Sequence, residues 1–126
     1  MCFVASSVQG LSDEMKDVIA MLHTTCQTET GVPEDMIQNT IKGEFPDDTR
    51  LKCYFKCIMT EMATMDDDGV VDVESTIAML PEEFQGGGIP ETIRKCGTQT
   101  GTDHCDTAWL TTKCYYDDNP SKYFVI

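Results

Sequence analysis

The stretch Leu51-Lys52-Cys53-Tyr54-Phe55-Lys56-Cys57 places two cysteines four residues apart within the strongest helical pattern of the chain. The apolar positions keep a helical period over four turns, at Leu51, Tyr54, Phe55, Ile58, Met59, Met62 and Met65. Residues four apart on a helix have Cβ atoms about 5–6 Å apart, whereas a disulfide needs about 3.5–4.5 Å. Cys53 and Cys57 therefore cannot bond to each other, and each must reach a different helix.

Six of the seven cysteines form a framework with 26, 3, 38, 8 and 8 residues between successive members, namely Cys26, Cys53, Cys57, Cys96, Cys105 and Cys114. Cys105 and Cys114 fall on opposite sides of one predicted helix, so they also bond elsewhere. Several of the connectivities that six cysteines permit stay open. The pattern is typical of a secreted domain, in which each bridge adds about 3–4 kcal/mol by the chain-entropy estimate.

A zinc site is the competing use of these thiols, with His104 next to Cys105 as a further ligand. No Cys-x-x-Cys pair is present, and a secreted chain meets an oxidising environment in which thiols pair. We therefore expect disulfides and no metal.

Length and charge indicate one domain and exclude two classes of partner. The chain has 126 residues, 40% of them hydrophobic, and 9 basic against 22 acidic residues give a formal net charge of −13. Such a charge repels nucleic acid and anionic membranes. No apolar run approaches the roughly 20 residues that a membrane helix needs, so we expect no membrane insertion.

The first ten residues read as the end of a secretory leader, because a short apolar stretch is followed by small residues. We expect residues 1–10 to be residual leader, the mature chain to start near Leu11, and Cys2 to stand outside the cysteine framework. A sequence artefact at this end is the alternative. In either case residues 11–126 form the predicted domain.

Apolar periodicity, caps and breakers predict an all-α fold with no strand. The six expected helices cover residues 12–28, 33–43, 47–65, 73–80, 90–96 and 103–116. The acidic run around Gly69 mimics a calcium loop, but Thr64 and Ser75 stand at its first and last ligand positions. No nucleophile or metalloprotease motif is present, so we expect an acidic turn, no cofactor and no enzyme activity.

The cysteine spacing, the helix count and three local sequences together resemble the insect odorant-binding proteins of the pheromone-binding and general odorant-binding type. The local sequences are Leu51-Lys52-Cys53-Tyr54-Phe55-Lys56-Cys57, Met65-Asp66-Asp67-Asp68-Gly69 and Lys122-Tyr123-Phe124-Val125-Ile126. The similarity covers residues 12–126. It implies a disulfide-stapled six-helix domain that encloses an apolar cavity, with the pairs Cys26–Cys57, Cys53–Cys105 and Cys96–Cys114.

The resemblance also implies a carrier that takes small hydrophobic volatiles through the lymph of sensory hairs to olfactory receptors, with homodimers common among relatives. The implied cavity wall comprises Tyr54, Met59, Met62, Val73, Thr76, Ile77, Leu80, Ile89, Ile93, Trp109, Thr112, Tyr115, Tyr123 and Phe124. Eight methionines suit an adaptable apolar site, although ordinary core packing explains part of the pattern equally well.

Two positions of this wall depart from the family, which often has a bulkier or more polar side chain at Thr112 and a tryptophan at Tyr115. The Tyr115 hydroxyl offers a hydrogen bond to an ester, aldehyde or alcohol oxygen, unless it only packs half-buried at the helix end.

The tail Tyr123-Phe124-Val125-Ile126 is apolar, whereas free chain ends are usually polar. Leaving it in water forfeits several kcal/mol at ~25 cal/mol per Å², so we expect it to close the cavity as a lid. By the resemblance, the terminal carboxylate of Ile126 meets Tyr54 and His23 in a pH latch. Acid has opposing effects there, because an imidazolium holds a carboxylate more firmly while protonation of the carboxylate releases it. A disordered or interface-forming tail and an ordinary helix histidine are the alternatives.

The predicted function is therefore a secreted carrier of small apolar volatiles. One alternative is a secreted interaction protein with a filled core, which acts through its acidic surface. The other is a carrier outside olfaction, for a hormone, a fatty acid or a cuticular lipid.

Overall fold

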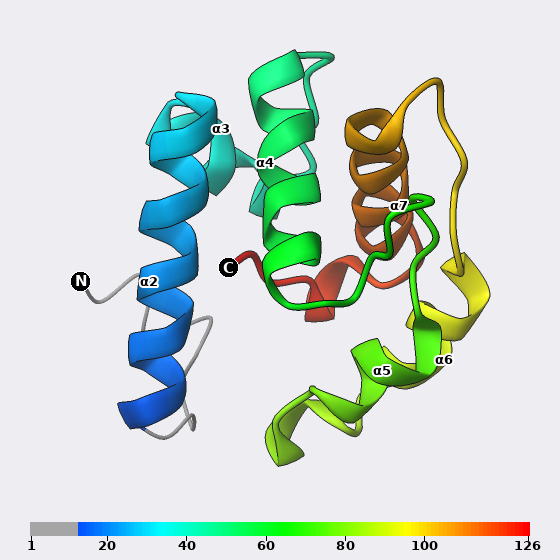
Figure 1. The fold of residues 1–126 in the computed structure, drawn as a ribbon. Coiled ribbons are helices and arrows are strands. Elements are labelled where there is room, and N and C mark those ends of the chain that lie inside the picture. Colours follow the sequence, from blue (N-terminus) through cyan, green and yellow to red (C-terminus); the bar gives the residue numbers. More distant parts are fainter. Residues whose placement is uncertain (1–12) are drawn as a thin grey trace.

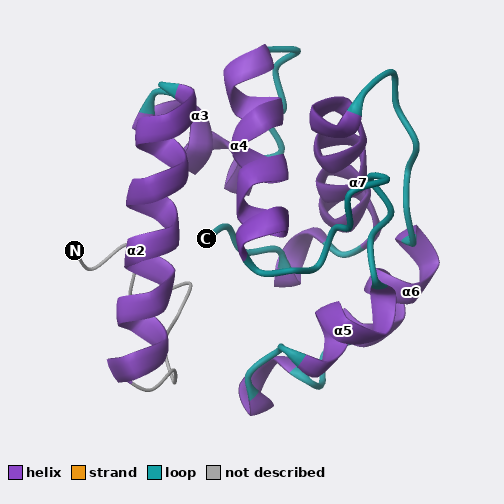
Figure 2. Cartoon of the chain, viewed as in Figure 1, coloured by secondary structure: helices purple, strands orange, loops and turns teal. Residues whose placement is uncertain are grey.

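A computed structural model describes residues 13–126, and the predicted leader, residues 1–10, lies outside the described residues. The described part consists of helices joined by loops and turns, as Figure 2 shows, with one isolated β-bridge between Met65 and Val71. Its elements are α2 (Asp13–Thr30), α3 (Glu34–Gln38), η1 (Asn39–Lys42), α4 (Thr49–Glu61), α5 (Val73–Ala78), η2 (Glu82–Phe84), α6 (Ile89–Cys96), α7 (His104–Asp118) and η3 (Pro120–Lys122). The all-α, six-helix prediction is confirmed.

Aspartates cap three of the helices. The side chains of Asp48, Asp72 and Asp103 accept hydrogen bonds from backbone N–H groups in the first turns of α4, α5 and α7, at 2.8, 3.0 and 2.8 Å. Each cap satisfies a donor that the helix itself leaves free. Hydrogen bonds from the Arg50 side chain and backbone hold the pKa of Asp48 at about 2.

Helix α4 ends at Glu61, four residues before the predicted end at Met65. The chain turns at Ala63, which has a left-handed φ of 58°, and the N–H of Thr64 then bonds to the Met59 carbonyl. Met65 is thereby placed in the bridge to Val71. The apolar period continued through Met65 because this residue is buried, although it is no longer helical.

The acidic run after α4 forms a tight turn. A carboxylate oxygen of Asp66 accepts the backbone N–H groups of Asp68 and Val70, each at 2.9 Å. Gly69, at φ 78°, lies directly under the ring of His104, where a Cβ would approach His104 Cδ2 to 2.5 Å. The turn therefore fixes the start of α7 against the α4–α5 connection.

Helix α4 is the centre of the molecule, with α2 on one side and α7 on the other (Figure 1). The side chains of Leu51 and Tyr54 on α4 are fully buried, together with Ile37 on α3. Disulfides join α2 to α4 through Cys26–Cys57, α4 to α7 through Cys53–Cys105, and α6 to α7 through Cys96–Cys114. These are the three pairs that the resemblance implies.

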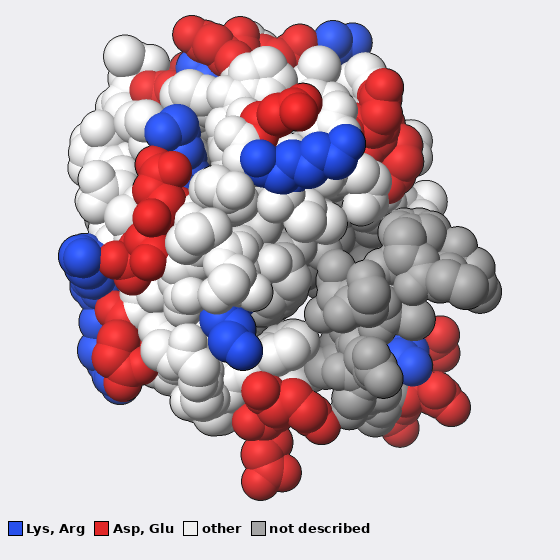
Figure 3. All heavy atoms as spheres, turned by 180° about the vertical axis from the view of Figure 1, so that it is seen from behind, with Lys and Arg blue, Asp and Glu red and all other residues white. Residues whose placement is uncertain are grey.

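The segment after α7 folds back toward the centre. In Figure 1 it runs behind α4, and the C-terminal residue lies between α2 and α4. This return places the apolar tail next to the inner faces of the helices. No helix within residues 13–126 has the length and hydropathy to span a membrane, and the face in Figure 3 carries many acidic side chains.

Candidate ligand-binding cavity

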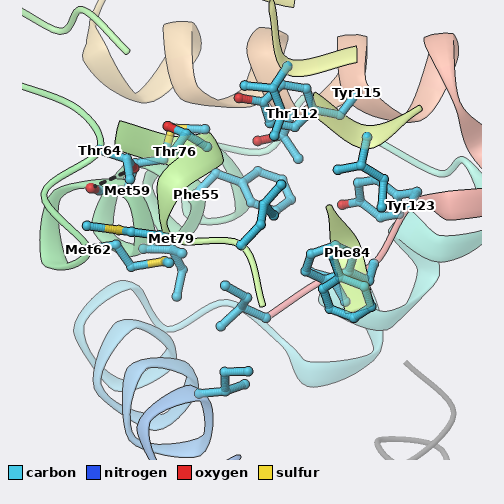
Figure 4. Close-up of a pocket in the computed structure, with 18 of the residues that line it drawn as sticks. Phe55, Met59, Met62, Thr64, Thr76, Met79, Phe84, Thr112, Tyr115 and Tyr123 are labelled. Carbon is cyan, nitrogen blue, oxygen red and sulfur yellow. Dashed lines mark hydrogen bonds between the residues drawn. The ribbon is translucent and has the colours of Figure 1, made fainter. Parts of the chain in front are cut away.

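An apolar cavity of about 230 Å³ lies between the helices and the tail. A water molecule occupies about 30 Å³ in the liquid, so the space suits a small organic molecule. The wall is drawn from α2, α4, the segment from α5 through η2, α6, α7 and the tail. Figure 4 shows side chains of Met59, Met62, Met79, Phe55 and Phe84 around it.

Most of the predicted ligand-contacting residues line this cavity. They are Tyr54, Met59, Met62, Thr76, Leu80, Ile89, Ile93, Thr112, Tyr115, Tyr123 and Phe124. Their shared position follows from helix periodicity on α4 and α7, which turns one face of each helix inward. Whether each of them contacts a ligand stays a prediction.

Val73 and Ile77 were predicted in the wall and do not line it. These two residues are four apart and share one face of α5, while Thr76 of α5 and the two residues Met79 and Leu80 that follow its end line the cavity. Ile77 is buried, but away from the cavity.

Trp109 is the third predicted wall residue that lies elsewhere. It packs half-buried against the core, and the Lys52 ammonium sits 4.5 Å from the centre of its ring. Lys52 also pairs with Asp47 and Asp106, at 2.7 and 2.9 Å. Trp109 therefore takes part in a cation–π contact at the α4–α7 interface, which is a structural role.

Several wall residues were absent from the prediction. From α2 come Met15, Val18, Ile19 and Leu22, and other elements add Phe55, Ile58, Thr64, Val71, Met79, Pro81, Phe84, Thr92, Asn119 and Lys122. The α2 residues follow a clear helical period, and this signal could have identified them. Phe84 lies in the three-residue 3-10 helix η2, which is too short for periodicity to indicate which way a side chain points.

The tail closes the cavity through contacts along its length. The hydroxyl of Tyr123 donates to Thr40 Oγ1 at 3.1 Å, and its ring packs against Phe45. The ring of Phe124 stacks on Phe84 with ring centres 4.6 Å apart. The described tail is thus docked on both the α3–η1 side and the η2 side of the cavity.

The end of the tail meets a polar cluster formed by His23, Glu34 and Tyr54. An oxygen of Ile126 accepts the Tyr54 hydroxyl at 2.6 Å and lies 3.0 Å from His23 Nδ1. His23 Nε2 lies 2.6 Å from Glu34 Oε1, and Nδ1 is also 3.0 Å from the Tyr54 hydroxyl. The contacts that the resemblance implied for His23, Tyr54 and Ile126 are present in this arrangement.

Glu34 was not anticipated, because nothing in the sequence near it indicates a bond to a side chain eleven residues earlier. Desolvation acts to raise the pKa of its carboxyl, but hydrogen bonds with His23 and Gln38 outweigh this and lower the pKa. Burial raises the pKa of Tyr54, followed by the nearby negative charge of Glu34. At neutral pH, Glu34 is therefore an anionic acceptor and Tyr54 a neutral donor.

Comparison with known proteins places this architecture in one family. The model of the PBP/GOBP family matches residues 9–118. General odorant-binding protein 69a of Drosophila melanogaster is 34% identical over 98 residues, which cover 77% of this chain and 66%, just under two thirds, of that relative. The B1 protein of Tenebrio molitor is 29% identical over 115 residues, which cover 91% of this chain and 88% of the relative.

Solved structures agree with this assignment. Odorant binding protein 4 of Chrysopa pallens is 30% identical with a TM-score of 0.79, covering 92% of this chain and 99% of that one. Odorant binding protein 7 of Anopheles gambiae, in complex with an azo compound, is 26% identical with a TM-score of 0.73, covering 86% and 88%. The chain belongs to the PBP/GOBP family of insect odorant-binding proteins, which are secreted, non-enzymatic carriers of small hydrophobic ligands.

Proposed function

We propose that this protein takes up small hydrophobic volatiles in the cavity and carries them through aqueous lymph to olfactory receptors. The observation that supports this most is the apolar cavity of about 230 Å³ between the helices and the docked tail. A filled-core interaction protein has no use for such a space. The −13 charge of the chain gives a hydrophilic exterior to a molecule with an apolar interior.

Uptake is driven by removing apolar ligand surface from water. Each methylene group that is buried contributes about 0.8 kcal/mol, so eight such groups supply about 6 kcal/mol. Micromolar affinity corresponds to about 8 kcal/mol, and the docked tail helps to approach that value because it excludes water from the wall formed by Phe84 and Phe124.

Release is controlled, in this proposal, by the tail contact of Ile126. His23 faces acceptors through both ring nitrogens, because Nε2 meets the Glu34 carboxylate and Nδ1 meets the Ile126 oxygen. A neutral imidazole carries only one N–H and cannot donate to both. An imidazolium donates to both, so protonation of His23 strengthens the tail contact.

The proposed pH response therefore has two stages. Histidine side chains in general gain their charge between about pH 8 and pH 5, while the lowered pKa of Glu34 keeps its carboxylate ionised on mild acidification, so the tail is held more firmly. Further acidification protonates Glu34 and, in a chain that ends at Ile126, its carboxylate. The acceptors are then lost and the tail is released, so we expect ligand affinity to be raised at pH 5 and lost only at lower pH.

Fluorescence titration of the disulfide-intact protein with N-phenylnaphthylamine tests the carrier function. We expect saturable one-to-one uptake at pH 7 and displacement by volatile alcohols, aldehydes and aromatics. Absence of uptake would refute the carrier function and favour the filled-core interaction protein.

The same titration at pH 5, with two variants, tests the tail contact. His23→Gln should abolish the difference between pH 7 and pH 5. His104→Gln is the matched control, since His104 is the other histidine of the chain and lies exposed at the start of α7. If His23→Gln and the unmodified protein respond alike to pH, the latch is wrong while the carrier function stands.

A further inference from the structure

Seven residues that line the cavity carry a hydroxyl group, and six of these hydroxyls donate to acceptors within the protein. The four threonines, Thr64, Thr76, Thr92 and Thr112, donate to the Met59, Asp72 and Ala108 carbonyls and the Asp118 carboxylate, at 2.7–3.1 Å. Tyr54 and Tyr123 donate to Ile126 and Thr40. Residues 13–126 therefore leave one hydroxyl of the wall without a hydrogen-bond partner.

That hydroxyl belongs to Tyr115. Its oxygen is buried and has no hydrogen-bond partner among the described residues. Native proteins pair nearly all buried polar groups, so an exception calls for an explanation. The indole nitrogen of Trp109 is the other such atom in the described part, but Trp109 does not line the cavity.

The position of Tyr115 fits a contact with one end of a ligand. Figure 4 shows Thr112 and Tyr115 close together on the α7 side of the pocket, while Met62 and Met79 lie on another side. Because Thr112 donates to its own helix, Tyr115 supplies the free donor there. The apolar part of a ligand can then extend toward the methionines.

The surroundings of Tyr115 favour a neutral acceptor over an ionised one. Burial alone raises the pKa of Tyr115 to about 12, with no contribution from a charged group. The phenol is therefore a donor at every physiological pH. An ionised carboxylate placed beside it would lose its hydration without gaining a cation, which is costly.

We propose that Tyr115 is a specificity-determining residue that donates a hydrogen bond to a neutral carbonyl oxygen of the ligand, as in a ketone, an aldehyde or an ester. This inference rests on the proposed carrier function, because it names the ligand class of the same cavity. A carbonyl ligand pairs the buried hydroxyl, whereas a hydrocarbon of the same shape leaves it unpaired.

The test compares two ligands of matched shape. One is heptyl methyl ketone, and the other is the alkene in which a methylene group replaces the ketone oxygen. Competition against N-phenylnaphthylamine gives the dissociation constant of each for the unmodified protein and for Tyr115→Phe, which removes only the hydroxyl. We expect the ratio of alkene to ketone dissociation constants to fall about 3- to 10-fold in Tyr115→Phe.

Tyr116→Phe is the matched control, because Tyr116 is the next residue and does not line the cavity. The ratio should stay unchanged in this variant and, for the unmodified protein, should be the same at pH 5 and pH 8. An equal ratio in Tyr115→Phe and the unmodified protein, with the fluorescent probe still bound, would overturn the inference and leave the carrier function standing. Failure of the unmodified protein to bind the probe would instead overturn the carrier function.

Discussion

Replacing Tyr54 with phenylalanine removes one atom from the contact that holds the tail. The Tyr54 ring is fully buried, and its hydroxyl donates to the Ile126 oxygen at 2.6 Å. Phenylalanine keeps the packing of the ring in the core. The change therefore isolates the hydrogen bond from the surrounding apolar contacts.

The loss of tail-docking free energy that we expect in Tyr54→Phe lies between two limits. A neutral hydrogen bond contributes about 0.5–1.5 kcal/mol, and one to a charged group about 1.5–3 kcal/mol. His23 Nδ1 stays within 3.0 Å of the oxygen and keeps a partner for it. We therefore expect tail docking to weaken by about 0.5–3 kcal/mol, which raises the undocked population about 2- to 150-fold, and Tm to fall by about 4 °C per kcal/mol.

Carboxypeptidase digestion of the 126-residue chain reads out tail undocking, because the enzyme removes Ile126 only from an exposed end. When docking is fast relative to cleavage, the rate of Ile126 release follows the undocked population. Tyr54→Phe should speed this release by the factor given above. Thermal unfolding followed by circular dichroism gives the accompanying shift in Tm.

Tyr116→Phe serves as the control, since Tyr116 packs against Phe45 and Tyr123 but its hydroxyl makes no hydrogen bond within the described residues. It should leave both the release rate and Tm nearly unchanged. Equal release rates for Tyr54→Phe and the unmodified protein would refute the reasoning, because the tail would then be held by apolar packing alone.

Three further predictions concern stability. Tyr115→Phe should leave the urea-unfolding free energy of the ligand-free protein unchanged or raise it by up to about 1 kcal/mol, because the hydroxyl is buried without a partner; a loss beyond about 1 kcal/mol would contradict this. Replacing the cysteines of the Cys53–Cys105 bridge with alanine should cost about 4 kcal/mol and those of Cys96–Cys114 about 3 kcal/mol, since their sequence separations are 52 and 18; a reversed order in urea unfolding would count against the chain-entropy account. The pKa of Asp48 is about 2 in the folded protein, below its ordinary value of 3.8, so its stabilising contribution is complete above about pH 4 and is lost as pH falls toward 2. Asp48→Asn should flatten the fall of Tm in that range, and parallel curves for the two proteins would show that the cap carries no pH dependence.

The long helices could be predicted from the sequence because periodicity and capping act locally. Asp48 and Asp103 are caps that stand directly before apolar periods, and the inward face of α4 follows from its spacing. Helix α5 has only six residues, too few for a period to show which face turns inward, and Val73 and Ile77, which were expected in the wall, do not line the cavity. The turn at Ala63 was missed because the apolar pattern continues beyond it.

Contacts between residues that lie far apart in the sequence could not be predicted without a known family member for comparison. The bond between His23 and Glu34 and the stack of Phe84 on Phe124 join segments that carry no local signal of their proximity. The latch contacts were anticipated only through the resemblance. The unpaired state of the Tyr115 hydroxyl depends on where every neighbouring acceptor lies, which the sequence alone does not specify.

The three disulfides connect only the helices α2, α4, α6 and α7. No disulfide has a cysteine in the stretch between Cys57 and Cys96. That stretch contributes Met79, Leu80 and Phe84 to the cavity. Substitutions there reshape the binding site without disturbing a single cross-link. Met79, Leu80 and Phe84 also lie outside the buried core cluster, so the shape of the cavity can change at these three positions while the cross-links and the core residues are kept.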